Sequence, residues 1–431
     1  MVNWSDCDKG ERANVLARPE ILSDAKILRN VDNILGMVRD SGDAALLDLT
    51  LKFDGIVLSS LRVPISESEA AWSGLDLLDQ QAMQTAKTNI EAFHLPQKPK
   101  PLNVETMPGV VCRREPRALD SAGLYVPAGT APLVSTLMML AIPAKLAGVP
   151  RCVVTTPPGK DGKIDKHVLA AAHLCGVDEV YCVGGAQAIA ALAFGTESIA
   201  KVAKIFGPGN AYVSTAKARV AQMAGGPAID LPAGPSEAMV LADDQADPVF
   251  VASDLLSQAE HDTMAQVVCV CRSQKFAQCL TDEINNQLTD LPRRNIAEAS
   301  LENGRIIVVN DRNTMIEIAN TYAAEHLIVQ IDKPESAVPH IQNAGSVFLG
   351  PWTPESVGDY ASGTNHTLPT NGAARAYSGV VLESFIKYIS VQQLSRAGLE
   401  ALGPSVERLA NMEGLEAHRR AVSLRLERGE Q

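Results

Sequence analysis

Short apolar segments alternate with amphipathic helical segments along most of this 431-residue chain. Runs of apolar and β-branched residues bounded by turn residues predict strands at 151–156, 179–183, 239–241, 267–271, 305–309, 327–330 and 346–349. Apolar residues at helical spacing predict intervening helices at 164–174, 188–194, 211–223, 248–261, 274–289, 313–323 and 334–342. Strands separated by helices form crossover units, so the sequence restricts the fold to α/β architectures with parallel sheets.

The length of the chain predicts more than one domain, because a single hydrophobic core rarely serves so many residues. We expect two doubly wound, incomplete Rossmann-like α/β domains with a small N-terminal helical arm and a helical C-terminal extension. The proline-rich stretch 95–101 predicts an extended connector. The expected boundaries are 1–22 for the arm, 23–128 with 237–380 for one α/β domain, 129–236 for the other, and 381–431 for the extension.

The charge balance of 38 basic against 50 acidic residues argues against nucleic acid or an anionic membrane as the main partner. Residues 1–12 contain no apolar signal core, and the longest uncharged apolar run, 133–144, is too short to span a bilayer. We therefore expect a cytoplasmic protein that acts on small molecules. None of the eight cysteines forms a C-x-x-C pair, which predicts free thiols and no disulfides.

One helical turn, 257–261, carries the first candidate functional group. Gln258 and His261 are three residues apart and share a face that differs from the buried stripe of the same helix. An imidazole and an amide oxygen presented together can hold a cation or a polar substrate. In isolation, a solvated helix end explains the same pattern, so the interpretation depends on the other polar groups of the chain.

Three further stretches carry polar residues that the fold alone does not require. They are Glu325 with His326 at a helix-to-strand joint, Asp359 in the long loop 351–377, and Glu413 with His418 near the end. Two imidazoles, a carboxylate and a neutral oxygen suit Zn²⁺, and a carboxylate beside an imidazole suits water activation and proton transfer. His366 lies in the same loop as Asp359, and the other four histidines are expected to be structural or exposed, namely His94, His167, His173 and His340.

Two glycine-rich loops follow predicted strands and open helices, at 184–187 and 207–210. A phosphate can bind to the free N–H groups of such a helix N-terminus. Neither loop has the full G-x-G-x-x-G pattern, and tight turns alone would explain the glycines of either one.

Taken together, these motifs resemble the histidinol dehydrogenase family. The similarity extends from Trp4 to the segment 413–418. The segments that carry it are 184–192, 206–210, 232–237, 255–261, 325–327 and 358–369.

The resemblance implies two consecutive NAD-dependent oxidations, from L-histidinol through L-histidinal to L-histidine, which are the last steps of histidine biosynthesis. It further implies a homodimer in which the C-terminal segment of one subunit completes the site of the other. In this interpretation Glu325 activates water and His326 serves as the base in both oxidations.

The implied binding residues follow from the matching motifs. The zinc ligands would be Gln258, His261, Asp359 and His418, with one Zn²⁺ per subunit. Substrate would contact these four ligands and also Ser236, His326 and Glu413. NAD would contact Tyr125, Gln187 and Asn210. The domain 129–236 is expected to bind NAD, and the domain formed by 23–128 with 237–380 is expected to carry most of the metal and catalytic site. The sequence does not distinguish Zn²⁺ from Mn²⁺.

Two alternatives remain at this stage. A zinc- and NAD-dependent dehydrogenase of another small alcohol, such as a sulfonated diol, could use the same scaffold. Glu413 argues against it, because a carboxylate attracts the cationic amine of histidinol and repels a sulfonate. An NAD-sensing or structural protein would not need Glu325, His326 and four metal ligands together.

Overall fold

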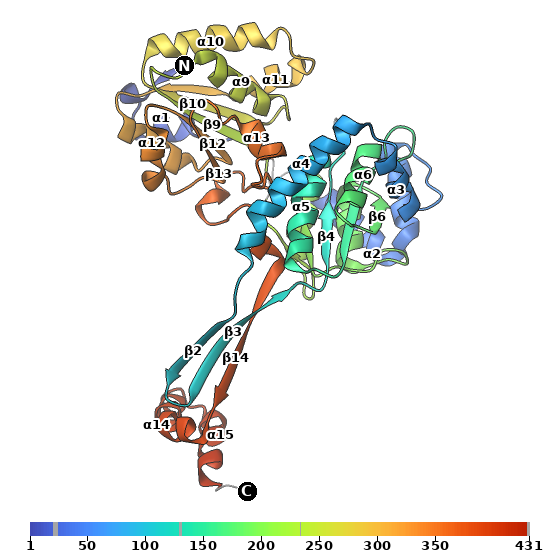
Figure 1. Ribbon diagram of the computed structural model, residues 1–431, viewed down its shortest axis with the longest axis vertical. Helices are drawn as coiled ribbons and strands as arrows, with labels where there is room; N and C mark the ends of the chain where they lie inside the picture. The colour runs from blue at the N-terminus through green and yellow to red at the C-terminus, as the bar shows by residue number, and fades with distance from the viewer. Residues whose placement is uncertain (20–24, 129–131, 233, 429–431) are drawn as a thin grey trace. The chain divides into compact units, whose positions relative to one another are not determined.

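The computed structural model describes residues 1–19, 25–128, 132–232 and 234–428. The chain divides into a main unit, Met1–Gln97 with Leu119–Phe385, and a small unit, Lys98–Ala118 with Ile386–Gln431. The main unit contains two parallel sheets, and the small unit contains one antiparallel sheet (Figure 1).

The first parallel sheet has five strands in the order β6-β5-β4-β7-β8. The first strand in the chain is central, the next two lie to one side, and the last two lie to the other, which is a doubly wound arrangement. Their bounds are β4 (Ala122–Tyr125), β5 (Cys152–Thr156), β6 (Glu179–Cys182), β7 (Lys204–Phe206) and β8 (Ala228–Ile229).

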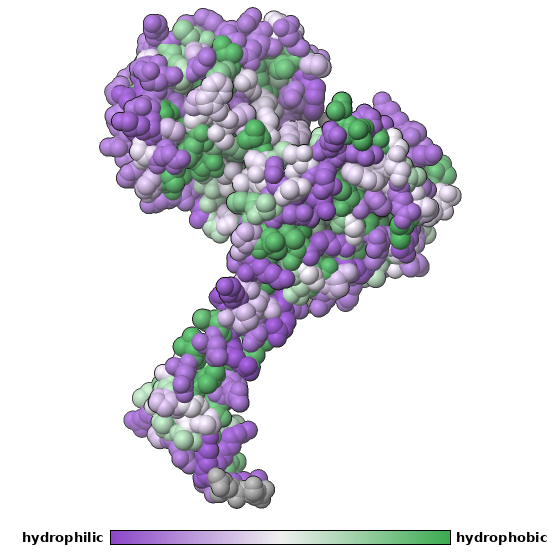
Figure 2. All heavy atoms as spheres, viewed as in Figure 1, coloured by the Kyte–Doolittle hydropathy of each residue, from purple (hydrophilic) through white to green (hydrophobic). Residues whose placement is uncertain are grey.

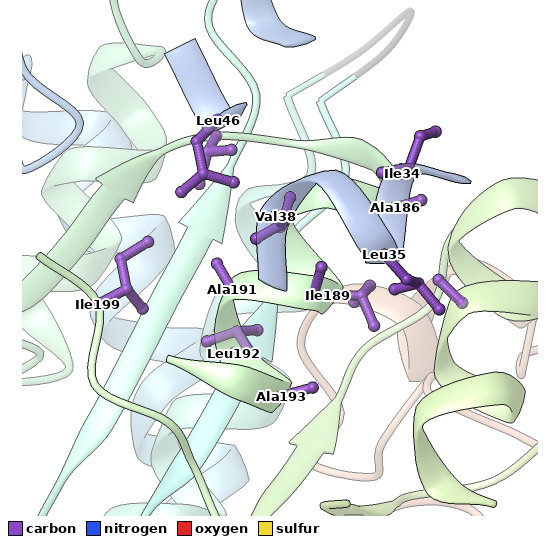
Figure 3. Packing of buried hydrophobic residues seen from close by; sticks show 14 of the residues in the cluster. Ile34, Leu35, Val38, Leu46, Ala186, Ile189, Ala191, Leu192, Ala193 and Ile199 are labelled. Atoms are coloured by element: carbon purple, nitrogen blue, oxygen red, sulfur yellow. The ribbon is translucent and has the colours of Figure 1, made fainter. Parts of the chain in front are cut away.

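Helices cover this sheet and exclude water from both faces. The long α2 (Ala25–Asp54) packs against α7 (Gly185–Phe194) and α8 (Ala211–Ala221) in one hydrophobic core. Figure 3 shows Leu35 and Val38 of α2 beside Ile189 and Ala191 of α7. The other helices of this lobe are α3 (Ile65–Ser73), α4 (Leu77–His94), α5 (Val134–Ala147) and α6 (Lys166–Leu174).

The second parallel sheet has six strands in the order β1-β11-β10-β9-β12-β13. Apart from β1 at one edge, it repeats the doubly wound order of the first sheet, so both predicted α/β units are confirmed. The strands are β1 (Val2–Asn3), β9 (Glu237–Ala242), β10 (Gln266–Cys271), β11 (Arg305–Val308), β12 (His326–Gln330) and β13 (Ser346–Leu349).

The two faces of the six-stranded sheet carry separate hydrophobic cores. One contains α9 (Pro248–Ala259), α10 (Gln274–Leu288) and α11 (Arg294–Glu302), and the other contains α12 (Arg312–Tyr322). The predicted helix at 334–342 is a 3₁₀ helix, Pro334–His340. The predicted loop 351–377 contains a short helix, α13 (Glu355–Tyr360).

The structure corrects the expected grouping of residues 23–128 with 237–380. Helix α2 packs on α7 and α8, and β4 is the central strand of the five-stranded sheet, so residues 25–97 and 119–128 belong with 132–232, whereas 98–118 lie in the small unit. The cause is tertiary, since the apolar stripe of α2 fits either sheet and only packing decides between them. The N-terminal arm also contains a strand, because β1 pairs with β11 before α1 (Lys9–Val15) begins.

The small unit is the part that the sequence patterns describe least well. Strands β2 (Leu102–Met107), β3 (Val110–Ala118) and β14 (Ile386–Leu394) form an antiparallel sheet in the order β14-β3-β2. Helices α14 (Arg396–Met412) and α15 (Glu416–Glu427) follow, as the predicted helical extension requires. The first residues of that extension differ, because Leu382–Phe385 form a 3₁₀ helix in the main unit and Ile386–Leu394 form β14.

Other general features agree with the sequence analysis. All eight cysteines are free. Within the described ranges, no helix combines the length and the apolar character that crossing a bilayer needs. Hydrophilic side chains cover much of the visible face of the six-stranded lobe (Figure 2).

Candidate active site

The candidate catalytic residues lie at the amino ends of two neighbouring strands, β9 and β12. Ser236 immediately precedes β9, Glu325 immediately precedes β12, and His326 is the first residue of β12. These two strands pair in parallel, with His326 opposite Ala238. Doubly wound sheets commonly bind ligands at the carboxyl ends of their strands, so this site uses the opposite edge of the sheet.

His326 has one ring nitrogen committed to the backbone and the other unpartnered. Its Nδ1 lies 3.3 Å from the carbonyl oxygen of Glu237, which can only accept a hydrogen bond, so Nδ1 carries the proton. Its Nε2 lies 3.3 Å from Oδ1 of Asp359. The orientation does not make a hydrogen bond, and both atoms are buried without such a partner among the described residues. A bound group placed here would satisfy both atoms.

Glu325 is held beside His326 by the backbone. Its Oε2 accepts a 2.8 Å hydrogen bond from the N–H of Glu237 and lies 3.7 Å from Nδ1 of His326. Burial raises the pKa of Glu325 to about 8, although the neighbouring His326 acts in the opposite direction. A carboxyl group that titrates near neutral pH suits proton transfer to and from water.

A second buried carboxylate, Glu355, lies close to the same imidazole. The potential ligand atoms of His326, Glu355 and Asp359 all lie within 4.8 Å of one another. Burial raises the pKa of Glu355 to about 8, and its Oε2 has no hydrogen-bond partner in the described structure. Burial of His326 opposes its positive charge, yet Glu355, Glu325 and Asp359 together raise its pKa to about 10. This concentration of negative charge fits a divalent cation, which would offset the carboxylates, lower the pKa of His326 and favour the neutral ring whose Nε2 can accept a proton.

Asp254 connects the elements that carry these groups. It lies on α9, one helical turn before Gln258, and its Oδ2 accepts a 2.8 Å hydrogen bond from Nε2 of Gln330 at the end of β12. It also accepts from the backbone N–H of Glu355, the first residue of α13. Burial raises the pKa of Asp254 to about 6. One carboxyl group thus joins α9, β12 and α13.

His366 fixes the position of Asp359 through the backbone. Its Nδ1 lies 2.8 Å from the carbonyl oxygen of Asp359, and its Nε2 lies 3.1 Å from Oγ1 of Thr136 on α5. Burial lowers the pKa of His366, in keeping with a neutral ring that donates from Nδ1 and accepts at Nε2. The neighbouring Asn365 donates to the carbonyl oxygen of Met139, so the loop is anchored on α5 at two points.

The turn at the end of α9 brings Gln258 and His261 together, as their spacing predicts. Nε2 of Gln258 lies 3.2 Å from Nδ1 of His261. Gln258 is fully buried and its Oε1 has no partner among the residues described, whereas His261 is exposed. The amide oxygen, the imidazole and the unpartnered Oδ1 of Asp359 offer the oxygen and nitrogen donors that Zn²⁺ accepts, so these residues fit the metal that the resemblance implies.

The other two residues predicted from the resemblance lie in the small unit. Glu413 ends α14 and His418 lies in α15, and both are exposed. Among the described residues of a single chain, neither lies in a cluster of metal-binding side chains. Their roles remain predictions.

The predicted NAD residues gather at the carboxyl ends of strands in the five-stranded sheet. Tyr125 ends β4, and its hydroxyl accepts a 3.2 Å hydrogen bond from the N–H of Gly185 at the start of α7. Burial raises the pKa of Tyr125 to about 12. Gln187 is buried one turn into the same helix. The N-cap residue of α7 is Gly184, which has no side chain to accept from the N–H groups that follow, so those beyond Gly185 suit a phosphate.

Asn210 lies at the other glycine-rich loop and serves as the N-cap of α8. Its Oδ1 accepts from the N–H groups of Tyr212 and Val213 at 3.1 and 3.2 Å, which leaves the exposed amide nitrogen for a ligand. These residues fit a dinucleotide. Because Asn210 caps α8, the N-terminus of α7 is the one that can bind a phosphate.

Sequence reasoning missed Asp254 and Glu355, and it placed His366 in a candidate stretch without assigning it a role. Glu355 precedes Asp359 by four residues, which is a helical spacing inside the presumed loop and was the available signal. His366 stands in a matching motif, but only its contact with Asp359 shows what it does. The contact of Asp254 with Gln330 spans 76 residues and has no local signal.

Buried acid and base groups without partners, at one edge of a doubly wound sheet, define the chain as an α/β enzyme. Comparison with known proteins gives the family. The chain belongs to the histidinol dehydrogenase family, whose model matches residues 17–426.

Individual relatives match over nearly their full length. Histidinol dehydrogenase from Vibrio parahaemolyticus is 49% identical over 427 residues, covering 99% of this chain and 98% of the relative. That from Colwellia psychrerythraea is 47% identical over 431 residues, covering 100% and 99%. The crystal structure of histidinol dehydrogenase from Elizabethkingia anophelis superposes with a TM-score of 0.94 at 46% identity, covering 99% of this chain and 97% of that one.

Proposed function

We propose that this protein oxidises L-histidinol to L-histidine through L-histidinal, with two molecules of NAD, as the last steps of histidine biosynthesis. Family membership over residues 17–426 supports the substrate. The observation that carries the chemistry is that Nε2 of His326 faces Asp359 without a hydrogen bond, while Nδ1 of the same ring lies 3.7 Å from Oε2 of Glu325. A buried base with a fixed tautomer and a neighbouring carboxylate is what two successive dehydrogenations with an intervening hydration require.

The proposal includes one Zn²⁺ per subunit, held by Gln258, His261 and Asp359 with His418 from a second copy of the chain. When bound, the ion would orient the imidazole and amine of the substrate without taking part in electron transfer. Glu413 would balance the cationic amine, and Ser236 would contact the substrate from the start of β9.

The residues of the chain then divide the proton transfers between them. Nε2 of His326 accepts the hydroxyl proton of histidinol while hydride passes to NAD, bound near Tyr125, Gln187 and Asn210. Glu325 accepts a proton from the water that adds to the bound aldehyde. His326 acts again as the base when the hydrate gives up its hydride. Retention of the aldehyde between the two steps keeps it from side reactions.

The direct test is the ratio of NADH formed to histidinol consumed by the zinc-loaded protein. We expect a ratio of two, with histidine as the only product. A ratio of one would show that the reaction stops at the aldehyde. Preferred oxidation of a sulfonated diol, with no turnover of histidinol, would overturn the substrate assignment.

Glu325→Gln separates the two oxidations. Water activation matters only once the aldehyde has formed, so this variant is expected to release the first NADH at the wild-type rate and the second more slowly. Single-turnover measurements with excess NAD would resolve the two phases. Equal slowing of both phases would contradict the role assigned to Glu325.

A further inference from the structure

A small pocket lies directly beside Glu325. Its volume is about 40 Å³, and because one buried water needs roughly 10–15 Å³ of such space, the pocket can hold a few water molecules. Ser236 and Glu325 form part of its wall, so it adjoins the proposed substrate position. Lys217, Asp230 and Thr367 form another part of the wall.

Lys217 and Asp230 form a buried ion pair in this wall. Nζ of Lys217 lies 2.5 Å from Oδ1 of Asp230 and donates to the carbonyl oxygen of Gly207 at 2.7 Å. Oδ2 of Asp230 accepts from the N–H of Gly207 at 2.7 Å. An ammonium group has three N–H donors, and these contacts use two of them. The third donor remains for a group in the pocket.

Thr367 supplies a second polar group without a partner. Its side chain is 4% exposed, and its Oγ1 makes no hydrogen bond with any described residue. Its backbone is fixed, because its N–H donates to Oδ1 of Asn365 and its carbonyl oxygen accepts from Val380. A buried hydroxyl in a polar pocket is usually satisfied by an ordered water.

We propose that this pocket binds the water molecule that adds to the aldehyde, and that Thr367 is a positioning residue for that water. The inference rests on the proposed function and adds to it the source of the nucleophile. The remaining donor of Lys217, the carboxylate of Glu325 and the hydroxyl of Thr367 give one water three partners, a number typical of buried water. The water then lies beside the base that activates it, in a pocket whose wall includes Ser236 from the substrate side.

The hydration step balances with these groups. The water oxygen forms the new bond to the aldehyde carbon, and one of its protons passes to Glu325. The aldehyde oxygen takes the proton that His326 acquired in the first oxidation, which gives the neutral hydrate and a neutral imidazole. In the second oxidation, hydride leaves the hydrate carbon for a second NAD, and His326 accepts the hydroxyl proton.

The test is Thr367→Val, which keeps the shape of the side chain and removes its hydroxyl. Free aldehyde hydrates in solution, so the aldehyde is generated on the holoenzyme from histidinol with excess NAD in a single turnover. We expect the first NADH to form at the wild-type rate and the second about tenfold more slowly, the usual effect of losing one hydrogen bond. Thr367→Ser retains the hydroxyl and is expected to restore the second phase.

Thr50→Val is the matched control, because Thr50 is also fully buried with an unpartnered Oγ1 but lies on α2, outside the pocket wall. We expect it to change neither phase. Equal slowing of both phases in Thr367→Val, or failure of Thr367→Ser to restore the second, would overturn the proposal. The ratio of NADH to histidinol in the wild type tests the proposed function separately. Failure of the water pocket proposal can therefore be distinguished from failure of the proposed function.

Discussion

His326 differs from the other candidate bases in having its tautomer fixed by the protein. The carbonyl oxygen of Glu237 holds the proton on Nδ1, and Nε2 faces Asp359 without a hydrogen bond. His366 has partners on both ring nitrogens and can only orient its neighbours. The imidazole with an unused nitrogen is therefore the one that can exchange a proton with a substrate.

This distinction predicts the effect of His326→Ala. Removal of a positioned base should lower turnover roughly 10²–10⁴-fold. Zinc content should stay at the wild-type level, because His326 is not among the proposed ligands. His340→Ala, at an exposed position, is the control and should behave as the wild type. Loss of zinc from His326→Ala would place this residue among the ligands.

Asp254 gives a prediction for the pH dependence of stability. Burial raises its pKa from 3.8 to about 6, so folding penalises its charged form. Its contribution to stability is therefore greatest below pH 3.8 and is lost as the pH rises through about 6. Asp254→Asn has no such loss. The free energy of unfolding of this variant minus that of the wild type should therefore be roughly 2 kcal/mol larger at pH 7.5 than at pH 4.5. Urea unfolding of both metal-free proteins at the two pH values measures this change. The same difference in unfolding free energy at both pH values would contradict the prediction.

At the scale of single elements, the glycine-rich loop after β7 depends on close backbone packing. Gly207 has φ of +115°, and a Cβ there would collide with the carbonyl oxygen of Tyr125. Asp230 and Lys217 hold its N–H and its carbonyl oxygen. The loop that leads to Asn210 is thus fixed against the strand that ends in Tyr125.

Gly207→Ala should therefore weaken NAD binding and stability together. We expect a loss of about 3 kcal/mol or more of stability and a rise of roughly tenfold in the dissociation constant for NADH. Gly225 also has positive φ, +74°, but open space around its Cβ, so Gly225→Ala isolates the backbone strain of about 1 kcal/mol. Urea unfolding and fluorescence titration with NADH compare the two. Equal effects would show that the contact with Tyr125 is unimportant.

Elements with a buried apolar pattern could be predicted from the sequence. The strands β9, β10 and β12 are buried at every position, and their short apolar runs between turn residues are typical of central strands in a parallel sheet. Strand β2 is exposed along its whole length and follows a proline-rich stretch, so its hairpin with β3 has no hydrophobic signal. The pairing of β14 with β3 joins residues that are about 270 positions apart, and no local pattern contains it.

In the candidate site too, residues related by a local sequence pattern could be predicted, and residues that meet only through tertiary packing could not. Gln258 and His261 could be predicted because a helical spacing of three places them together, and the structure joins them at 3.2 Å. Glu325 and His326 are adjacent in the chain and so required no folding information. Glu355 and Asp254 act through contacts between α9, β12 and α13, which depend on how these elements pack.

At the scale of the whole molecule, the small unit has features of a surface that binds a partner. Its exposed large apolar side chains include Leu409 and Met412 of α14, Ile389 of β14 and Leu102 of β2. Exposed apolar side chains concentrated in so small a unit are typical of interfaces. A second copy of the chain is the partner that the resemblance implies, and it would bring Glu413 and His418 to the main unit of the first copy.

Mixed dimers test this arrangement. His326→Ala and His418→Ala should each be inactive alone, but in a mixed dimer one site receives both defects and the other receives neither. Partial unfolding of a mixture followed by refolding should restore about a quarter of wild-type activity, because random pairing makes half of the dimers mixed. Each protein refolded alone is the control and should stay inactive. An affinity tag on one variant verifies the exchange, and exchange without recovered activity would place His418 in the site of its own chain.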